Sequence, residues 1–183
     1  MTSTEQDERE RVAADVRLAV RDVADFPKPG ILFRDITPVL LDAALFARVT
    51  EALAAPFAGL GVTHVVSIES RGFILGAPVA QALGASFVPV RKPGKLPSRT
   101  VREDYALEYG TDAVEMHADA LTGARSVLVV DDVLATGGTA AATCRLVERA
   151  GARIAACSFL LEISALNGRA ALGRRRVESL VAY

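Results

Sequence analysis

The chain has 183 residues, of which 51% are hydrophobic and 23% charged, and its formal net charge is −1. These values predict one soluble globular domain over residues 1–183, and the balanced charge gives no reason to expect a nucleic-acid partner or membrane binding. The two cysteines do not make a disulfide framework and are expected as buried free thiols. No apolar run is long enough to span a membrane, and the charged N-terminus lacks the apolar region of a secretory signal. A cytoplasmic location is therefore expected.

The N-terminal third predicts two helices. Apolar residues recur at helical spacing from Arg9, so the first helix is expected to run to about Ala24, ahead of Pro27. Asp42 is expected to cap the second helix, which ends near Phe57 before two glycines.

The middle of the chain predicts two strands and a hairpin. Strands are expected at 64–68 and 86–90, on either side of a helical segment at 73–83. A basic segment with glycine and proline follows. Residues 105–109 and 114–117 are then expected to pair across the Gly-Thr-Asp between them.

The C-terminal third returns to alternating elements. Residues 127–131 predict a buried strand, followed by a short turn and a helix to about Ala150. A strand at 154–161, a short helix at 164–172 and a strand at 177–183 complete the chain.

Strands that alternate with helices predict an α/β fold with a mainly parallel, twisted sheet flanked by helices. The hairpin interrupts this alternation. An insertion rich in glycine and proline at the carboxyl edge of a sheet is typical of a lid over a ligand site, and this one is expected over about 93–118.

The most specific chemical signal stands at the end of the strand at 127–131. Asp131 and Asp132 come there, followed by a glycine- and hydroxyl-rich turn at a helix start, which predicts an anion site, above all for phosphate. The two carboxylates suit sugar hydroxyls or a divalent cation, so a sugar phosphate is expected. A plain β-turn would leave both carboxylates unexplained, and neither a Walker A loop nor a G-x-G-x-x-G motif is present. This anion turn consists of Ala135, Thr136, Gly137, Gly138 and Thr139.

The segment VVDDVLATGGT closely resembles the phosphoribosyl-pyrophosphate signature of the type I phosphoribosyltransferase family. The resemblance implies the fold of that family, with a hairpin hood inserted into the α/β domain. It assigns Asp131 and Asp132 to the ribose and the anion turn to the 5′-phosphate. It also implies Mg²⁺ that arrives with phosphoribosyl pyrophosphate, with no metal tightly held by protein side chains.

A second loop, Glu69-Ser70-Arg71-Gly72, follows the strand at 64–68. A polar turn with an arginine is common on its own, but a pyrophosphate leaving group needs such a cation. The resemblance implies that Ser70 and Arg71 bind pyrophosphate, that Arg71 takes part in catalysis, and that a cis peptide bond lies at Ser70–Arg71.

A third cluster, Arg91, Lys92 and Lys95, lies in the segment RKPGKLP. A solvated loop or a weak nucleic-acid patch is the alternative, but single-strand sites usually interleave aromatic residues and this segment has none. In the family the matching segment binds the diphosphate, often in the neighbouring subunit. The resemblance therefore implies a homodimer with Arg91 reaching the neighbouring site.

The segment DFPKPGILFRD resembles one found in adenine phosphoribosyltransferases and much less in other members. By itself it also fits core residues followed by a surface ion pair. The resemblance implies that Phe33 stacks on the purine, that the backbone of Ile31 reads its edge and that Arg34 lies beside it. With the first helix, this gives an N-terminal base-binding region at about 9–36.

The segment YALEYG fits either an exposed hairpin strand or the family's flexible hood. The hood would bring Glu108 close to the purine, as an acid, a base or an orienting group, and Tyr109 to the pyrophosphate.

Together these motifs predict an adenine phosphoribosyltransferase, which transfers the 5-phosphoribosyl group of phosphoribosyl pyrophosphate to adenine and gives AMP and pyrophosphate. Two alternatives remain. One is a phosphoribosyltransferase for xanthine or for hypoxanthine and guanine, against which residues 25–35 argue. The other is a non-catalytic regulator that senses phosphoribosyl pyrophosphate and binds nucleic acid, for which an appended DNA-binding domain would be expected.

Overall fold

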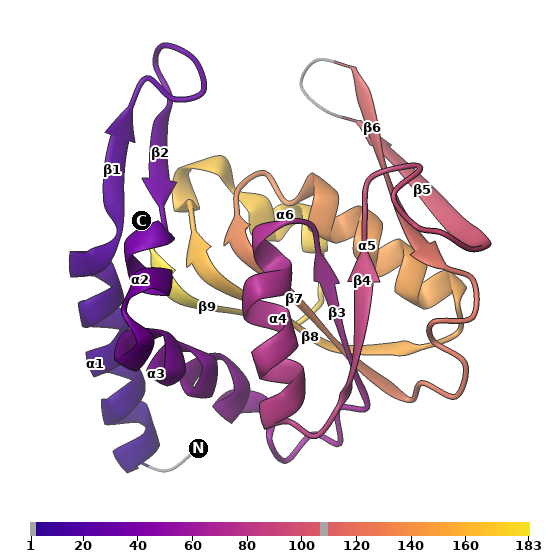
Figure 1. Ribbon diagram of the computed structural model, residues 1–183, viewed down its shortest axis with the longest axis horizontal. Coiled ribbons are helices and arrows are strands. Elements are labelled where there is room, and N and C mark those ends of the chain that lie inside the picture. The colour runs from indigo at the N-terminus through magenta and orange to yellow at the C-terminus, as the bar shows by residue number, and fades with distance from the viewer. Residues whose placement is uncertain (1–2, 107–109) are drawn as a thin grey trace.

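The computed structural model describes residues 3–106 and 110–183 (Figure 1). Within these residues, five parallel strands form a central sheet in the order β4-β3-β7-β8-β9. They are β3 (His64–Ile68), β4 (Ser86–Val90), β7 (Ser126–Leu134), β8 (Arg153–Glu162) and β9 (Val177–Ala182). The predicted parallel α/β sheet is therefore confirmed.

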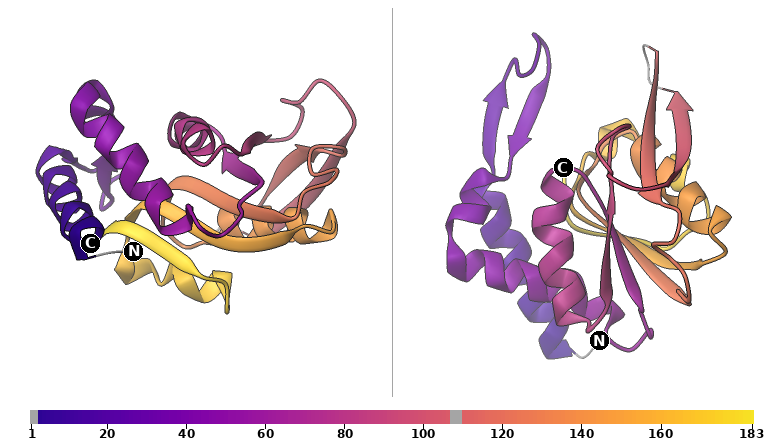
Figure 2. Two further views of the ribbon diagram at one scale, coloured as in Figure 1. Left: turned by 90° about the horizontal axis from the view of Figure 1, so that it is seen from below. Right: turned by 45° about the vertical axis from the view of Figure 1, so that its right-hand side comes forward.

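Helices cover both faces of this sheet (Figure 2). The first face packs against α1 (Ser3–Ala19), α2 (Thr37–Leu41), α3 (Ala43–Ala54), the 3₁₀ turn Ala55–Phe57 and α4 (Arg71–Ala82). The second face packs against α5 (Gly138–Arg149) and α6 (Gly168–Leu172), which follows the 3₁₀ turn Ser164–Leu166. Among the described residues, no helix has the length and apolar character needed to cross a membrane.

Strand β7 is buried on both sides. Leu128 and Val130 belong to the core on the first face of the sheet (the first core). Val127 and Val129 belong to the core on the second face (the second core), and all four residues are 0% exposed. Side chains alternate between the faces of a sheet, so a strand covered on both faces reads as a continuous apolar run. This is why the sequence alone located the strand.

Two antiparallel hairpins rise from the edge of the sheet where its strands end (Figure 1). The first hairpin pairs β1 (Arg21–Ala24) with β2 (Leu32–Asp35). The second hairpin, the predicted hood, pairs β5 (Thr100–Ala106) with β6 (Thr111–His117) and is inserted between β4 and β7. The right-hand view of Figure 2 shows them standing apart at this edge.

The first helix lies closer to the N-terminus than predicted, since it starts at Ser3 instead of Arg9. It ends at Ala19 instead of Ala24, because residues 21–24 form β1. Val23 continues the helical spacing of apolar residues, but it pairs with Phe33 in the first hairpin. Pairing with a distant segment has overridden the local pattern here.

The second hairpin is offset from the prediction. Its first strand starts at Thr100 rather than at Tyr105, and Thr111 and Asp112 belong to the second strand rather than to the turn. The longer ladder brings Tyr105 and Met116 into the second core. Burial of these side chains thus sets a register that turn residues alone did not reveal.

Other local signals are confirmed. Asp42 caps α3, since its Oδ1 accepts the backbone N–H groups of Ala44 and Leu45, each at 3.0 Å. Cys144 and Cys157 are buried free thiols whose Sγ atoms lie 3.5 Å apart.

Candidate active site

The predicted sugar and pyrophosphate residues come together at the carboxyl ends of β3 and β7, which are neighbours in the sheet. Asp131 and Asp132 lie within β7, which continues to Leu134, and Arg71 is the first residue of α4, directly after the loop that follows β3. The Nε of Arg71 donates to Oδ2 of Asp132. Both hairpins rise from this same edge (Figure 1), so the contact between Arg71 and Asp132 lies at the edge that carries them.

The two carboxylates have different surroundings. Asp132 is 6% exposed and is paired with Arg71. Asp131 accepts the backbone N–H of Asp132 at 2.9 Å. Burial raises the pKa of Asp131 well above its ordinary value, and the neighbouring Asp132 carboxylate raises it further. Burial beside a like charge therefore favours the protonated form of Asp131.

Gly72 makes room for this arrangement. A Cβ at position 72 would lie 2.5 Å from Oδ1 of Asp131 and 3.2 Å from Oγ of Ser67. The glycine after Arg71 thus lets α4 start close to the acidic end of β7. The sequence showed the glycine but not the neighbour that requires it.

The anion turn packs against the start of α6. Gly137 has φ +80°, a conformation that side chains rarely adopt, and a Cβ there would clash with the carbonyl oxygen of Gly168. In the same way, a Cβ at Gly168 would clash with the carbonyl oxygen of Ala135. Sequence reasoning missed Gly168, because its role depends on contacts with a turn some 30 residues earlier in the chain.

An ion pair holds α6 in place beside this turn. Arg169 donates from Nε and Nη2 to the two carboxylate oxygens of Glu162, at 2.7 and 2.8 Å, and from Nη1 to the carbonyl of Val177 at 3.0 Å. The Arg169 guanidinium lowers the pKa of the buried Glu162 carboxyl. The turn is thus supported by a charged, two-point contact behind it.

Glu69 connects the loop that contains Arg71 to the cluster of Arg91, Lys92 and Lys95. Its carboxylate accepts Nε of Arg91 at 2.8 Å and the backbone N–H of Lys92 at 2.6 Å. Burial raises the pKa of Glu69, but the Lys92 amide and the Arg91 guanidinium outweigh burial and hold it below its ordinary value. Arg91 also donates to the carbonyl of Lys95 at 3.1 Å. Within this single chain, Arg91 therefore faces its own Glu69.

The cis peptide bond stands one residue earlier than expected. It joins Glu69 to Ser70, not Ser70 to Arg71. The expected position was carried over from a resemblance, and nothing in the local sequence distinguishes the two peptide bonds.

Lys92 extends the site to the second hairpin. Its Nζ donates to the hydroxyl of Tyr105 at 3.0 Å and to the carboxylate of Asp112. The hydroxyl of Thr139, in the anion turn, donates to the same Tyr105 oxygen at 3.0 Å. Sequence reasoning did not single out Tyr105 or Asp112, because their value depends on the register of the hairpin.

The first hairpin brings its aromatic ring to the charged edge. The centroid of Phe33 lies 5.4 Å from the guanidinium carbon of Arg71 and 5.1 Å from the ring of Phe26. Asp25 accepts the backbone N–H of Gly30 at 2.7 Å and closes the turn before Ile31, which is 36% exposed. A half-buried aromatic ring is thus placed beside the arginine that pairs with Asp132.

Arg34 takes a different direction from Phe33. Its Nη1 donates to Asp22, and its guanidinium carbon lies 4.1 Å from the ring centroid of Tyr183. Successive side chains of a strand point to opposite faces, so Phe33 and Arg34 lie on different sides of β2. In this structure Arg34 supports the hairpin from the face opposite Phe33.

Two predicted residues, Glu108 and Tyr109, lie outside the described residues. Among the residues that the structure describes, no group of three or more His, Cys, Asp or Glu side chains is arranged to hold a metal ion. The described part of the site combines the acidic pair and the anion turn with Arg71, Arg91 and Lys92, each of which is paired with a carboxylate.

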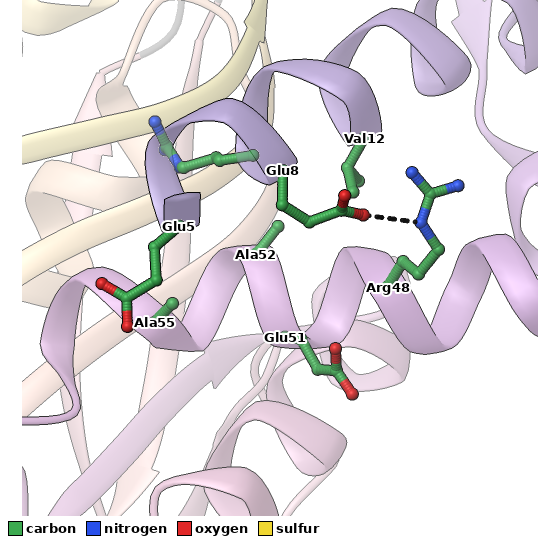
Figure 3. Close-up of a pocket in the computed structure, with 8 residues that line it drawn as sticks. Glu5, Glu8, Val12, Arg48, Glu51, Ala52 and Ala55 are labelled. Atoms are coloured by element: carbon green, nitrogen blue, oxygen red, sulfur yellow. Dashed lines mark hydrogen bonds and ion pairs between the residues drawn. The ribbon is translucent and has the colours of Figure 1, made fainter. Parts of the chain in front are cut away.

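A separate pocket of about 160 Å³ lies between α1 and α3 (Figure 3). Glu8 and Arg48 form an ion pair of 3.1 Å at its edge. It contains none of the predicted site residues, and the two helices that form it belong to the first core. We attribute it to the packing of α1 on α3.

Comparisons with known proteins show the family and the fold. Residues 40–171 match the family described as phosphoribosyl transferase domain. The chain is 59% identical over 172 residues to adenine phosphoribosyltransferase of Myxococcus xanthus, covering 94% of each. The crystal structure of adenine phosphoribosyltransferase from Thermoanaerobacter pseudethanolicus aligns with a TM-score of 0.90 at 46% identity, covering 93% of this chain and 99% of that one. The Saccharomyces cerevisiae enzyme, complexed with an imino-altritol bisphosphate and adenine, aligns with a TM-score of 0.87 at 38% identity, covering 93% and 98%.

Proposed function

The chain belongs to the adenine phosphoribosyltransferase family, and we propose that it transfers the 5-phosphoribosyl group of phosphoribosyl pyrophosphate to N9 of adenine, giving AMP and pyrophosphate. Family and fold are as predicted from the sequence. The observation that carries the proposal is the contact series from Phe33 through Arg71 to Asp132. It sets a stacking surface for a flat base beside the acids proposed for the sugar.

Each part of the substrate has a proposed set of contacts. Asp131 and Asp132 would accept hydrogen bonds from the ribose hydroxyls. The anion turn would hold the 5′-phosphate at the start of α5, where backbone N–H groups and the helix dipole favour negative charge. For pyrophosphate the proposed residues are Ser70, Arg71, Arg91, Lys92, Lys95 and Tyr109. For adenine they are Ile31 and Phe33 by direct contact, with Arg34 holding the hairpin from the opposite face of β2.

The proposed reaction develops positive charge at C1′ of the ribose as pyrophosphate leaves. The carboxylates of Asp131 and Asp132 would stabilise that positive charge, and Arg71 would stabilise the negative charge on the leaving group. Arg71 is therefore proposed as catalytic. Glu108 is proposed as the acid, base or orienting group next to the purine.

The acidic pair also suits Mg²⁺ that arrives with phosphoribosyl pyrophosphate. Burial and the neighbouring Asp132 carboxylate raise the pKa of Asp131, so a bound cation would favour its ionised form, and carboxylate oxygens are ligands that Mg²⁺ accepts. When bound, the ion would offset the charge of the diphosphate. Asp131 and Asp132 would hold it only together with oxygens of the substrate.

A homodimer in the cytoplasm, with Arg91 reaching the neighbouring site, is part of the proposal. It is tested by mixing two inactive variants, R91A and D132N, and measuring the activity of the mixed dimer. If Arg91 serves the neighbouring site, one of the two sites in a mixed dimer carries both defects and the other carries neither. Activity should then return to about half the wild-type value, whereas no recovery would place Arg91 in its own subunit's site.

The function itself is tested by product formation. The purified chain is incubated with phosphoribosyl pyrophosphate, Mg²⁺ and each of adenine, hypoxanthine, guanine and xanthine. We expect AMP from adenine at a rate at least about a hundredfold above the other bases, since backbone donors and acceptors distinguish an amino from an oxo group. A higher rate with any oxopurine would contradict the base assignment. An R71A variant should lose AMP synthesis in the same assay.

A further inference from the structure

The hydroxyl of Tyr105 lies where three segments of the site meet. It accepts a hydrogen bond from Nζ of Lys92 at 3.0 Å and another from Oγ1 of Thr139 at 3.0 Å. It donates to Oδ2 of Asp112 at 3.1 Å. Tyr105 and Asp112 come from the second hairpin, Lys92 follows β4, and Thr139 belongs to the anion turn.

These contacts use the whole hydrogen-bonding capacity of the hydroxyl. A phenol has one donor and two acceptor positions, and here all three are occupied. Tyr105 is only 6% exposed, so its ring and hydroxyl are held in place by the second core. A buried hydroxyl with three partners is held in one position and can orient the longer side chains around it.

Lys92 is the side chain whose position depends most on these contacts. Its ammonium group ends a long flexible chain and has three donor positions, of which Tyr105 and Asp112 take two. Burial lowers the pKa of Lys92, but Asp112 and Tyr105 outweigh burial and raise it, so the ammonium group stays charged. One donor position remains for a phosphate oxygen.

We propose that Tyr105 and Asp112 are positioning residues, which hold Lys92 for the diphosphate group and, through Tyr105, link it to Thr139 in the anion turn. This inference rests on the proposed function, because that function assigns Lys92 and Thr139 to opposite ends of phosphoribosyl pyrophosphate. Neither Tyr105 nor Asp112 contacts substrate in the proposal. Each acts through a neighbour.

The two residues differ in what they touch, and this difference makes the inference testable. Asp112 contacts Lys92, Tyr105 and the backbone N–H of Ala113, so it serves the diphosphate end. Tyr105 contacts both Lys92 and Thr139, so it serves both ends. Loss of Asp112 should weaken pyrophosphate binding selectively, whereas loss of the Tyr105 hydroxyl should also weaken binding of the 5′-phosphate.

The experiment measures dissociation constants by calorimetry for two probes, inorganic pyrophosphate with Mg²⁺ and ribose 5-phosphate. The variants are D112N and Y105F, which keep the size of each side chain. D112E serves as the conservative rescue. D104N is the matched control, because Asp104 lies on β5 next to Tyr105 but forms an exposed ion pair with Arg102. Thermal denaturation of every variant accompanies the titrations.

We expect D112N to raise the Kd for pyrophosphate about fivefold or more and to leave the Kd for ribose 5-phosphate within about twofold. Y105F should raise both constants about threefold or more. D112E should restore pyrophosphate binding at least in part, and D104N should match wild type. If D112N does not fold, the dissociation constants of Y105F compared with those of D104N decide whether the positioning role holds.

The inference is overturned if D112N and Y105F bind pyrophosphate as wild type does, or if D112N weakens both probes equally, as a general loss of structure would. These outcomes differ from failure of the proposed function. Wild-type chain that binds both probes but makes no AMP would contradict the function and leave the positioning role standing. AMP synthesis with unchanged variants would contradict the positioning role alone.

Discussion

The anion turn and the first hairpin lie at the same edge of the sheet, but they are built in different ways. The turn follows β7, whose residues Val127 to Val130 are fully buried, and it is backed by Gly168 at the start of α6. The first hairpin is a two-stranded ribbon on which Phe26 and Leu32 are each 50% exposed. An isolated ribbon has little core of its own and depends on contacts at its base.

This difference separates two tasks. The sugar phosphate is common to all phosphoribosyl transfer, and its proposed site directly follows a buried strand and packs against α6. The base is what distinguishes one member of the family from another, and its proposed site stands on an exposed ribbon. Substitutions in the turn should therefore affect folding and phosphate binding together, whereas substitutions in the first hairpin should affect base binding with little change in stability.

The largest effect is expected from G137A. The added Cβ would clash with the carbonyl of Gly168 in addition to straining a residue at φ +80°. We expect a loss of roughly 3 kcal/mol or more in stability and a large rise in the KM for phosphoribosyl pyrophosphate. Thermal denaturation and steady-state kinetics measure both.

Gly151 provides the control for that prediction. It has φ +81°, but no atom lies within 4 Å of the place that an added Cβ would occupy, so G151A carries the backbone strain without the clash. G151A should lose about 1–2 kcal/mol and keep its KM. Equal losses for the two variants would show that the contact with α6 is unimportant.

A smaller effect, confined to the base, is expected from F33A. Loss of a stacking surface costs about 1–3 kcal/mol, so the KM for adenine should rise roughly 5- to 150-fold. The KM for phosphoribosyl pyrophosphate and the melting temperature should change little. L32A is the control, because Leu32 lies on the same strand but its side chain points to the face opposite that of Phe33. A drop in melting temperature as large as that of G137A would contradict the contrast between the two regions.

The third prediction concerns pH and the acidic pair. Because the folded-state pKa of Asp131 is raised above its ordinary value of 3.8, the folded chain retains a proton that the unfolded chain releases. Stability therefore falls as pH rises from 3.8 towards the raised pKa. D131N removes this penalty and should melt a few degrees higher than wild type at about pH 7, with the difference vanishing near the ordinary pKa.

D132N is the companion variant, since it removes the partner of Arg71 and should not be stabilised at neutral pH. If D131N melts at the same temperature as wild type at neutral pH, the acidic pair is not under electrostatic strain. Melting curves without ligand, across the acid range, make this comparison.

The smallest effect is expected from Tyr183, which supports the first hairpin at its base. Arg34 lies 4.1 Å from the centre of the Tyr183 ring, and such a contact is worth about 0.5–1 kcal/mol. Y183L should raise the KM for adenine about two- to fivefold, whereas Y183F, which keeps the ring, should not. A change in the KM for phosphoribosyl pyrophosphate instead would place Tyr183 outside base binding.

Much of the fold was readable from the sequence because its signals are local. The buried strand β3 and the edge strand β4 were located by their apolar residues, and Asp42 was identified as a cap by its position before a helical pattern. The anion turn was recognisable because the turn, with its glycines and hydroxyls, follows the two acids after only two intervening residues. Each of these signals depends on residues within one turn or one strand of each other.

Other features were decided only when distant segments met. Val23 fits a helix until Phe33 pairs with it, Gly168 has no evident role until it meets Gly137, and Tyr105 gains its partners from the register of a hairpin. Sequence periodicity records which face of an element is apolar, but it does not record which element packs on that face. By itself the sequence determined the chemistry at the strand ends; the order of strands and the packing of α6 and the hairpins decided how those groups are held together.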